Sequence, residues 1–142
     1  MTAEFRHLVR ESWPTILSAS DTLAGRFYVH LSAIDRSAAE LFAKTDMASQ
    51  RARLIHSLSA LVHALDEPER LFQSLGPLAK RHALLGVQLR HFDSVGDALL
   101  WALADTLGPR FTPELRTAWA EAYALISSVM KRAIERPTVA AS

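Results

Sequence analysis

The chain has 142 residues, of which 49% are hydrophobic and 22% charged. This composition predicts one globular domain over residues 1–136 and a flexible tail over 137–142. A net charge of +1 gives no electrostatic reason to expect nucleic acid or an anionic membrane as a partner. Because the chain has no cysteine, disulfides, thiolate ligands and iron–sulfur clusters are excluded.

Apolar residues recur at three- and four-residue spacing through the first half of the chain, the pattern of amphipathic α-helices. The expected helices span residues 4–18, 21–31, 38–42 and 46–65. The last of these has the clearest apolar stripe, and Thr45 or Asp46 can cap its first turn.

Prolines divide the helical pattern in the second half of the chain. Pro68 can open one helix and Pro77 the next, which carries His82. A further helix over 92–107 ends at a Gly-Pro pair, and the last helix begins near Pro113. No segment shows sustained two-residue alternation or a hairpin signal. The predicted fold class is therefore all-α, with six to eight helices.

His82 lies on an apolar helical face that also carries Leu78 and Leu85. A histidine in such a place is most often an ordinary core residue, but it can also be the axial ligand of a haem iron. A ligating imidazole should donate its other N–H to a nearby backbone carbonyl. On a helix, the Leu78 carbonyl lies one turn before His82 and can accept that bond.

Side chains further upstream are candidates for the opposite face of such a cofactor. A gas such as O2 gains negative character on iron, so a hydrogen-bond donor is needed beside it. Gln50 and Tyr28 supply an amide and a hydroxyl, Leu54 continues the same apolar stripe, and Phe42 can stack on a macrocycle. The ordinary alternatives are a solvated Gln50 and core positions for the other three.

Several motifs occur in a characteristic order: ESW, RFYVHL, SQRARLIHSL, KRHALLGVQLRHFDSVGDALL and AWAEAYALISSVM. Together they resemble the globins, and within them the single-domain bacterial haemoglobins and the haem domain of flavohaemoglobins. The resemblance extends from about Phe5 to about Ala133. It implies the globin fold, a three-over-three helical sandwich around one haem b.

The resemblance also implies roles for individual residues. His82 matches the proximal iron ligand and Phe42 the ring stacked on the haem, while Tyr28, Gln50 and Leu54 match the distal residues that face bound gas. Leu78, Leu85 and Phe92 are expected along the proximal side of the cofactor. Arg53 is expected either to pair with a haem propionate or to be solvated. His30 and His91 are expected to touch a propionate or to be solvated.

Two positions depart from the flavohaemoglobin pattern. Phe92 stands where those relatives usually have a tyrosine, and Ile134 where they usually have a glutamate. In those relatives the tyrosine and glutamate join a hydrogen-bond chain to the proximal histidine, which strengthens its donation to iron. Their replacement here favours gas binding over oxidative chemistry.

The leading hypothesis for function is reversible binding of O2, and of NO and CO, at ferrous haem iron, in oxygen transport or storage. The alternatives are NO dioxygenation with a separate reductase, and haem-based gas sensing; whether the protein is an enzyme stays open. The chain lacks the run of roughly 18 apolar residues that a membrane span needs, and its N-terminal residues do not form a secretory signal. We expect a cytoplasmic monomer or homodimer.

Overall fold

A computed structural model describes residues 2–84 and 86–135 of the chain. Leu85 and the tail predicted over 137–142 lie outside the described residues. All regular structure within the described ranges is helical, which confirms the predicted fold class. The elements are α1 (Ala3–Ser18), α2 (Ser20–Ile34), α3 (Arg36–Glu40), α4 (Met47–Ala64), α5 (Pro68–Leu84), α6 (His91–Leu107), the 3-10 turn η1 (Gly108–Arg110) and α7 (Pro113–Glu135).

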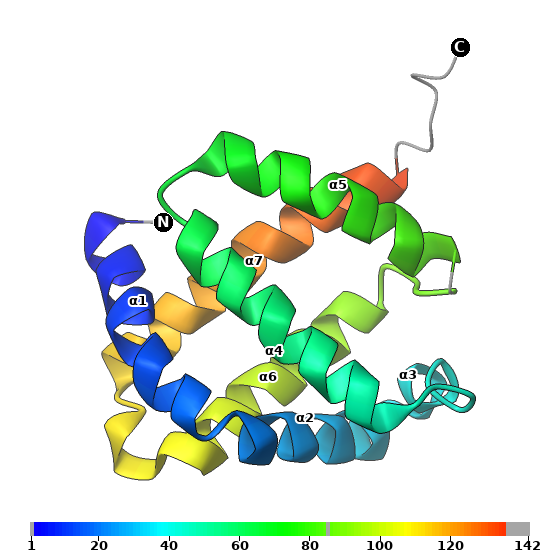
Figure 1. The fold of residues 1–142 in the computed structure, drawn as a ribbon, viewed down its shortest axis with the longest axis horizontal. Coiled ribbons are helices and arrows are strands. Elements are labelled where there is room, and N and C mark those ends of the chain that lie inside the picture. Colours follow the sequence, from blue (N-terminus) through cyan, green and yellow to red (C-terminus); the bar gives the residue numbers. More distant parts are fainter. Residues whose placement is uncertain (1, 85, 136–142) are drawn as a thin grey trace.

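The six long helices form two layers of three (Figure 1). Helices α1, α4 and α5 lie over α2, α6 and α7, and the layers meet where α1 and α5 pack on α7 and where α4 packs on α2. The short α3 leads from α2 towards α4 at one end of the molecule. This is the three-over-three sandwich predicted from the resemblance. None of the described helices is long and apolar enough to span a membrane.

Short polar side chains cap the first turns of α1, α3, α4 and α7, where Thr112 accepts a hydrogen bond of 3.2 Å from the Leu115 N–H at the start of α7. Thr2 and Asp35 each accept a hydrogen bond of 3.2 Å from the backbone N–H three residues later, at the starts of α1 and α3. Asp46 accepts one of 3.3 Å from the N–H two residues later, at the start of α4. Each cap of this kind stabilises a helix by about 0.5–2 kcal/mol. The predicted cap by Asp46 is confirmed.

A single helix, α5, covers the segment in which two were predicted. It begins at Pro68 as expected but continues through Pro77, where the sequence pattern places the start of a separate helix. Proline has no N–H, so the carbonyl of Gln73 loses its helical partner. The side chains of Pro77 and Gln73 are exposed, so water can take the place of that partner. As a result, His82 lies in the last turn of a long, continuous helix.

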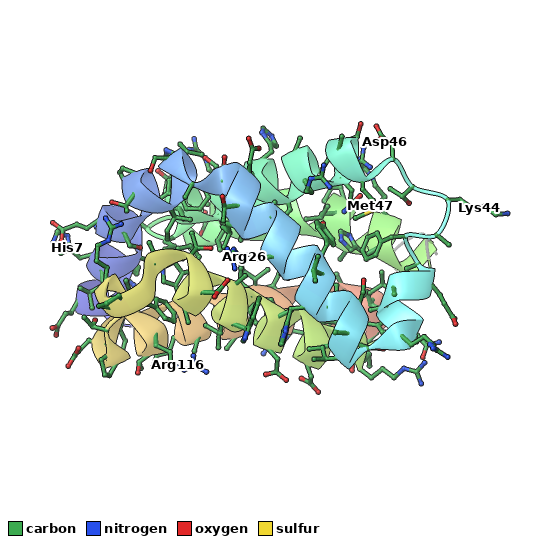
Figure 2. The ribbon with its side chains drawn as sticks, turned by 90° about the horizontal axis from the view of Figure 1, so that it is seen from below. His7, Arg26, Lys44, Asp46, Met47 and Arg116 are labelled. Atoms are coloured by element: carbon green, nitrogen blue, oxygen red, sulfur yellow. The ribbon has the colours of Figure 1, made fainter. Side chains whose placement is uncertain are left out.

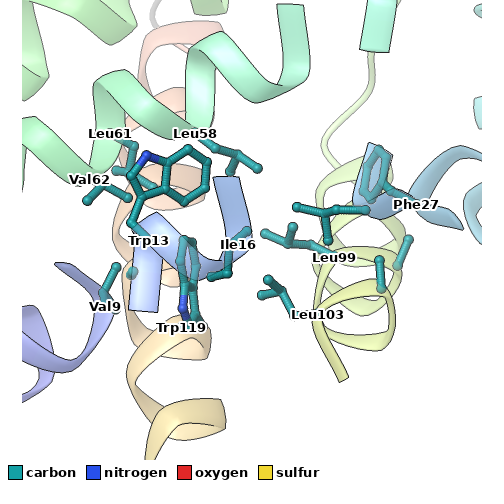
Figure 3. Close-up of a cluster of buried hydrophobic side chains, with 14 of the residues drawn as sticks. Val9, Trp13, Ile16, Phe27, Leu58, Leu61, Val62, Leu99, Leu103 and Trp119 are labelled. Atoms are coloured by element: carbon teal, nitrogen blue, oxygen red, sulfur yellow. The ribbon is translucent and has the colours of Figure 1, made fainter. Parts of the chain in front are cut away.

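The centre of the core is a pair of tryptophans from opposite layers (Figure 3). The ring centroids of Trp13 on α1 and Trp119 on α7 are 6.3 Å apart, with planes tilted by 46°. Trp119 is fully buried, and its indole Nε1 donates a hydrogen bond of 3.0 Å to the Ser12 hydroxyl, so its burial leaves no polar atom unpaired. Aliphatic side chains from α1, α4 and α6 belong to the same buried cluster, among them Val9, Ile16, Leu58, Leu61, Val62, Leu99 and Leu103. Helix α1, which carries Trp13, lies on the opposite side of the sandwich from α3 and the C-terminal end of α5 (Figure 1).

Helices α6 and α7 approach each other closely at Gly96. A Cβ atom built there would lie 2.7 Å from Cε2 of Tyr123, closer than a carbon–carbon contact allows. The tyrosine ring cannot easily withdraw, because its hydroxyl donates a hydrogen bond of 2.6 Å to the Phe92 carbonyl. The approach of the two helices therefore depends on glycine at this position.

Replacing Gly96 with alanine should lower the free energy of unfolding by about 1–3 kcal/mol, because the added methyl group overpacks the interface. Gly25→Ala is a matched control, since a Cβ at this position in α2 meets no atom within 4 Å. That control should be neutral or stabilising by about 0.5–1 kcal/mol, because alanine favours helix. Urea denaturation measures both variants. Equal stability of Gly96→Ala and the wild type would contradict the close approach.

Candidate functional site

The predicted site residues lie at the end of the sandwich formed by α3, the start of α4 and the end of α5. Figure 2 shows Lys44, Asp46 and Met47 at this end, where the chain passes from α3 into α4, far from His7 on α1. Hydrogen bonds and ring contacts bring Tyr28, Phe42 and Gln50 together. Among the described residues, no hydrogen bond or ring contact joins His82 to this group.

His82 is half-buried, and its ring is oriented by a backbone carbonyl. Its Nδ1 lies 2.7 Å from the carbonyl oxygen of Leu78, which is the hydrogen bond expected from the sequence. Because a carbonyl only accepts, Nδ1 carries the proton, and Nε2 of the neutral ring keeps its lone pair. This tautomer is the one that a metal-ligating histidine needs.

The chain turns sharply just after His82. Gly86 has a φ of +93°, in the left-handed region that favours glycine. The N–H of Val87 then donates a hydrogen bond of 3.0 Å to the His82 carbonyl, closing the end of α5 in the manner of a Schellman motif. These two features hold the last turn of α5, and with it the imidazole, in one place.

Gln50 is hydrogen-bonded on both sides of its amide. Its Nε2 donates to the Tyr28 hydroxyl at 3.1 Å, while its Oε1 accepts from Nη2 and Nε of Arg53 at 3.0 and 3.3 Å. The Tyr28 oxygen thus serves as an acceptor towards Gln50, and its own proton is left for another partner. The three side chains form a directed relay from a cation on α4 to a hydroxyl on α2.

Tyr28 is buried among aromatic rings that fix its position. Its ring lies edge-on to Phe27 and Phe42, at centroid distances of 4.8 and 5.3 Å. Burial raises the pKa of Tyr28, although the hydrogen bond from Gln50 and the charge of Arg53 act in the opposite direction. The hydroxyl therefore keeps its proton at neutral pH and is a hydrogen-bond donor.

Leu54 and Leu78 are half-buried and pack against the core, and Phe92 is buried. Leu85, the other side chain predicted along the proximal side, lies outside the described residues. The predicted contact between Arg53 and a propionate stays a prediction.

Tyr123 is a residue of this region that sequence reasoning missed. Its hydroxyl donates to the carbonyl of Phe92, so it is bound to the backbone of α6 rather than to His82. Burial raises the pKa of Tyr123, and the charges of Asp93 and Asp97 add to the effect. The inward position of Tyr123 is readable from helical spacing, but its partner depends on how α6 and α7 cross.

His91 is buried, with only 3% of its surface exposed, which corrects the expectation that it is solvated. Its Nδ1 accepts the Gln88 N–H at 2.9 Å, so Nε2 carries the proton and donates to the Ser37 hydroxyl at 2.9 Å. Ser37 in turn donates to a carboxylate oxygen of Asp35 at 2.6 Å. His91 therefore ties the segment that follows His82 to the corner between α2 and α3. His30 stacks on Trp101, with ring centroids 4.2 Å apart.

The described residues fit a haem. One half-buried imidazole has its Nδ1 proton bonded to a carbonyl and a free Nε2, which matches the donor chemistry of a haem-iron ligand. A hydroxyl with an uncommitted proton, flanked by an aromatic ring, lies on another helix. A three-over-three helical sandwich with such a histidine indicates the class of all-helical proteins that hold a haem through an axial imidazole.

Comparison with known proteins identifies the family. The chain matches the globin family model over residues 30–130. Flavohemoproteins from Bordetella pertussis and Deinococcus radiodurans are 29% and 30% identical to it over 132 residues, covering 92% of this chain and 33% of theirs. The chain thus spans about a third of the length of these curated relatives. It belongs to the globin family.

Solved structures agree on the fold. A bacterial globin from Campylobacter jejuni has a TM-score of 0.84 at 21% identity, covering 94% of this chain and 96% of its own. An engineered carbene transferase, made from a candidate nitric oxide dioxygenase of Rhodothermus marinus, has a TM-score of 0.86 at 27% identity. That match covers 95% of this chain and 94% of the other.

Asp35, at the corner between α2 and α3, makes the stability of the fold depend on pH in the acid range. Hydrogen bonds from the hydroxyls of Ser37 and Ser94 hold the pKa of its carboxyl well below its usual range, with a further contribution from the Ala38 N–H. A carboxylate with a lowered pKa stabilises the fold above the unfolded-state pKa of about 3.9, and that stability is lost as the pH falls.

Asp35→Asn should therefore be less stable than the wild type near about pH 7, and the difference should shrink as the pH falls below about 4. Denaturation at a series of pH values measures this difference. Asp21→Asn, an exposed position in the first turn of α2, is the control and should show a much weaker trend. A deficit that stays constant through the acid range would mean that the hydroxyls do not stabilise the charge of Asp35.

Proposed function

We propose that this globin binds haem b with His82 as its axial ligand, and that it binds O2, and also NO and CO, reversibly. The observation that carries the proposal is the Tyr28 hydroxyl, which accepts a hydrogen bond from Gln50 and so keeps its own proton free. When bound, haem supplies the ferrous iron that takes up diatomic gases. Oxygen transport or storage is the role that fits such binding.

On the proximal side, the chain orients and tunes the ligand. The Leu78 carbonyl fixes the ring plane of His82 and draws on its Nδ1 proton, which raises the basicity of Nε2. A backbone carbonyl is a weaker acceptor than a carboxylate, and Phe92 and Ile134 contribute no polar group. Moderate electron donation of this kind favours holding a gas over driving its reduction.

On the distal side, the chain supplies the Tyr28 hydroxyl as a donor, oriented by Gln50 and flanked by aromatic rings. Phe42 packs edge-on to Tyr28, and Leu54 follows Gln50 one turn later on α4. Apolar neighbours reduce access of water, so a hydrogen bond from Tyr28 to a polar gas ligand is strengthened. Such a donor favours O2, which becomes polar on binding, over CO.

The relatives favour NO dioxygenation as a second candidate. Flavohemoproteins are among the most similar curated proteins, and one structural neighbour derives from a candidate nitric oxide dioxygenase. Tyr28 and Gln50 would serve that reaction as well. In it, O2 and NO would combine to nitrate, and a separate reductase would supply the electron that returns the iron to the ferrous state. Sustained NO consumption with a flavin reductase and NADH distinguishes catalysis from reversible binding.

The protein should copurify with haem or take it up when supplied, and reduction should give a visible spectrum that shifts on addition of CO. His82→Ala should lose the haem or its protein-ligated spectrum, because no other imidazole occupies that place in α5. His56→Ala, an exposed position on α4, is the control and should retain both. A wild type that binds no haem would overturn the proposal.

Tyr28→Phe should raise the rate of O2 dissociation from the haem-loaded protein by about tenfold, the effect of losing one hydrogen bond of about 1.4 kcal/mol. CO dissociation should change much less, because CO accepts hydrogen bonds weakly. Stopped-flow displacement measures both rates. Tyr123→Phe removes the other tyrosine hydroxyl, which is bound to the Phe92 carbonyl, and should leave the O2 rate close to that of the wild type. An unchanged O2 rate in Tyr28→Phe would remove Tyr28 from gas binding.

A further inference from the structure

Arg53 determines which way the amide of Gln50 points. A guanidinium group has only donors, so the amide group that faces it must be the oxygen. Two of its nitrogens, Nη2 and Nε, lie 3.0 and 3.3 Å from Oε1 of Gln50. The amide nitrogen is then turned towards the Tyr28 hydroxyl, 3.1 Å away.

The orientation of this amide decides the use of the Tyr28 proton. An amide rotated by half a turn has the same shape but presents its oxygen to the tyrosine. The Tyr28 hydroxyl would then donate its one proton to Gln50, and no proton would be left for a ligand. In the observed orientation the hydroxyl accepts from Gln50, and its proton stays free.

Other groups near Arg53 do not compete strongly for it. Asp46 is close enough for the charge of Arg53 to lower the pKa of its carboxyl. That carboxylate already accepts hydrogen bonds from the Ser49 hydroxyl at 2.7 Å and from the Ala48 N–H at 3.3 Å. The guanidinium hydrogen-bonds to Gln50 instead, three residues earlier on the same helical face.

We propose that Arg53 is a positioning residue that locks the Gln50 amide and thereby reserves the Tyr28 proton for a ligand in the distal pocket. The inference rests on the proposed function, because the ligand is a gas bound at haem. It assigns Arg53 a role different from the propionate contact expected from the sequence. The residue acts on the gas only through Gln50 and Tyr28.

The first test follows the Gln50 amide itself by nuclear magnetic resonance of the purified protein, in its diamagnetic CO form when haem is bound. The chain has three glutamines, so the Gln50 side-chain signal is identified by its loss in Gln50→Ala. In the wild type, its amide protons should exchange slowly and show a contact with the Tyr28 ring. In Arg53→Met, exchange should be faster by about threefold or more, because the donors that fix the oxygen are gone.

Two further variants separate the hydrogen bond from general effects of charge. Arg53→Lys keeps a cationic donor but lacks the paired Nε and Nη2 donors, so it should restore part of the wild-type amide behaviour. Arg51→Met removes the same charge two residues away on α4, where the arginine is not hydrogen-bonded to Gln50 or Tyr28. It should behave like the wild type.

The second test measures gas binding in the haem-loaded variants. Arg53→Met should raise the O2 dissociation rate by about threefold to tenfold, because a share of the molecules then spend the Tyr28 proton on Gln50. Arg53→Lys should lose O2 more slowly than Arg53→Met, because it keeps a charged donor beside Gln50. CO dissociation should respond little in any of them.

Faster amide exchange together with faster O2 loss in Arg53→Met, both partly rescued by lysine, would support the proposal. An unchanged Gln50 amide would overturn it, as would a changed amide with an unchanged O2 rate. Faster haem loss without a change at Gln50 would also overturn it, since Arg53 would then act on the cofactor. Failure of the wild type to bind haem would refute the proposed function, while the amide measurement would still report on the Arg53–Gln50 contact.

Discussion

The hydrogen bond between Nδ1 of His82 and the Leu78 carbonyl is the interaction on which the site depends. It is made within one turn of α5, so the helix itself assigns the imidazole tautomer and leaves Nε2 unprotonated. The position of that helix depends in turn on its packing against α7 and on the reversal of the chain at Gly86. The tautomer of His82 is therefore a consequence of helix geometry, while the position of its ring also depends on the turn that follows α5.

The distal group is built on a different principle. Gln50 and Arg53 are three residues apart on one helix, but their target, Tyr28, comes from another helix in the opposite layer. The relay therefore forms only when α4 packs across α2. The packing of α4 on α2 thus both joins the two layers and orients the Tyr28 hydroxyl.

Local features of this chain were predictable from the sequence, and long-range ones were not. The apolar stripe of α4, its cap at Asp46 and the bond from His82 to Leu78 all follow from spacing within a few residues. The helix break predicted at Pro77 was wrong, because α5 continues through it. Pro77 lies on an exposed face of the helix, which tolerates a missing backbone hydrogen bond better than a buried face does.

The burial of His91 shows why other parts of the site could not be predicted from the sequence. Its ring is held by Gln88, close in sequence, and by Ser37, which is 54 positions away. Nothing in the local pattern distinguishes it from the exposed histidines. The same applies to Arg53, whose spacing from Gln50 was visible but whose choice of partner depends on where Tyr28 holds the amide.

The two sides of the proposed haem site differ in how much the protein can tune them. On the proximal side, the Tyr123 hydroxyl lies against the backbone of Phe92 and is committed to its carbonyl. Among the described residues, the hydrogen-bond partner of the His82 ring is the Leu78 carbonyl, in place of the tyrosine and glutamate of the flavohaemoglobin pattern. On the distal side, the solvent-exposed guanidinium of Arg53 is linked through the Gln50 amide to the buried hydroxyl of Tyr28. A globin arranged in this way would set its gas affinity mainly by hydrogen bonding to the ligand. The series of hydrogen bonds would begin at Arg53 on the surface and pass through Gln50 to Tyr28.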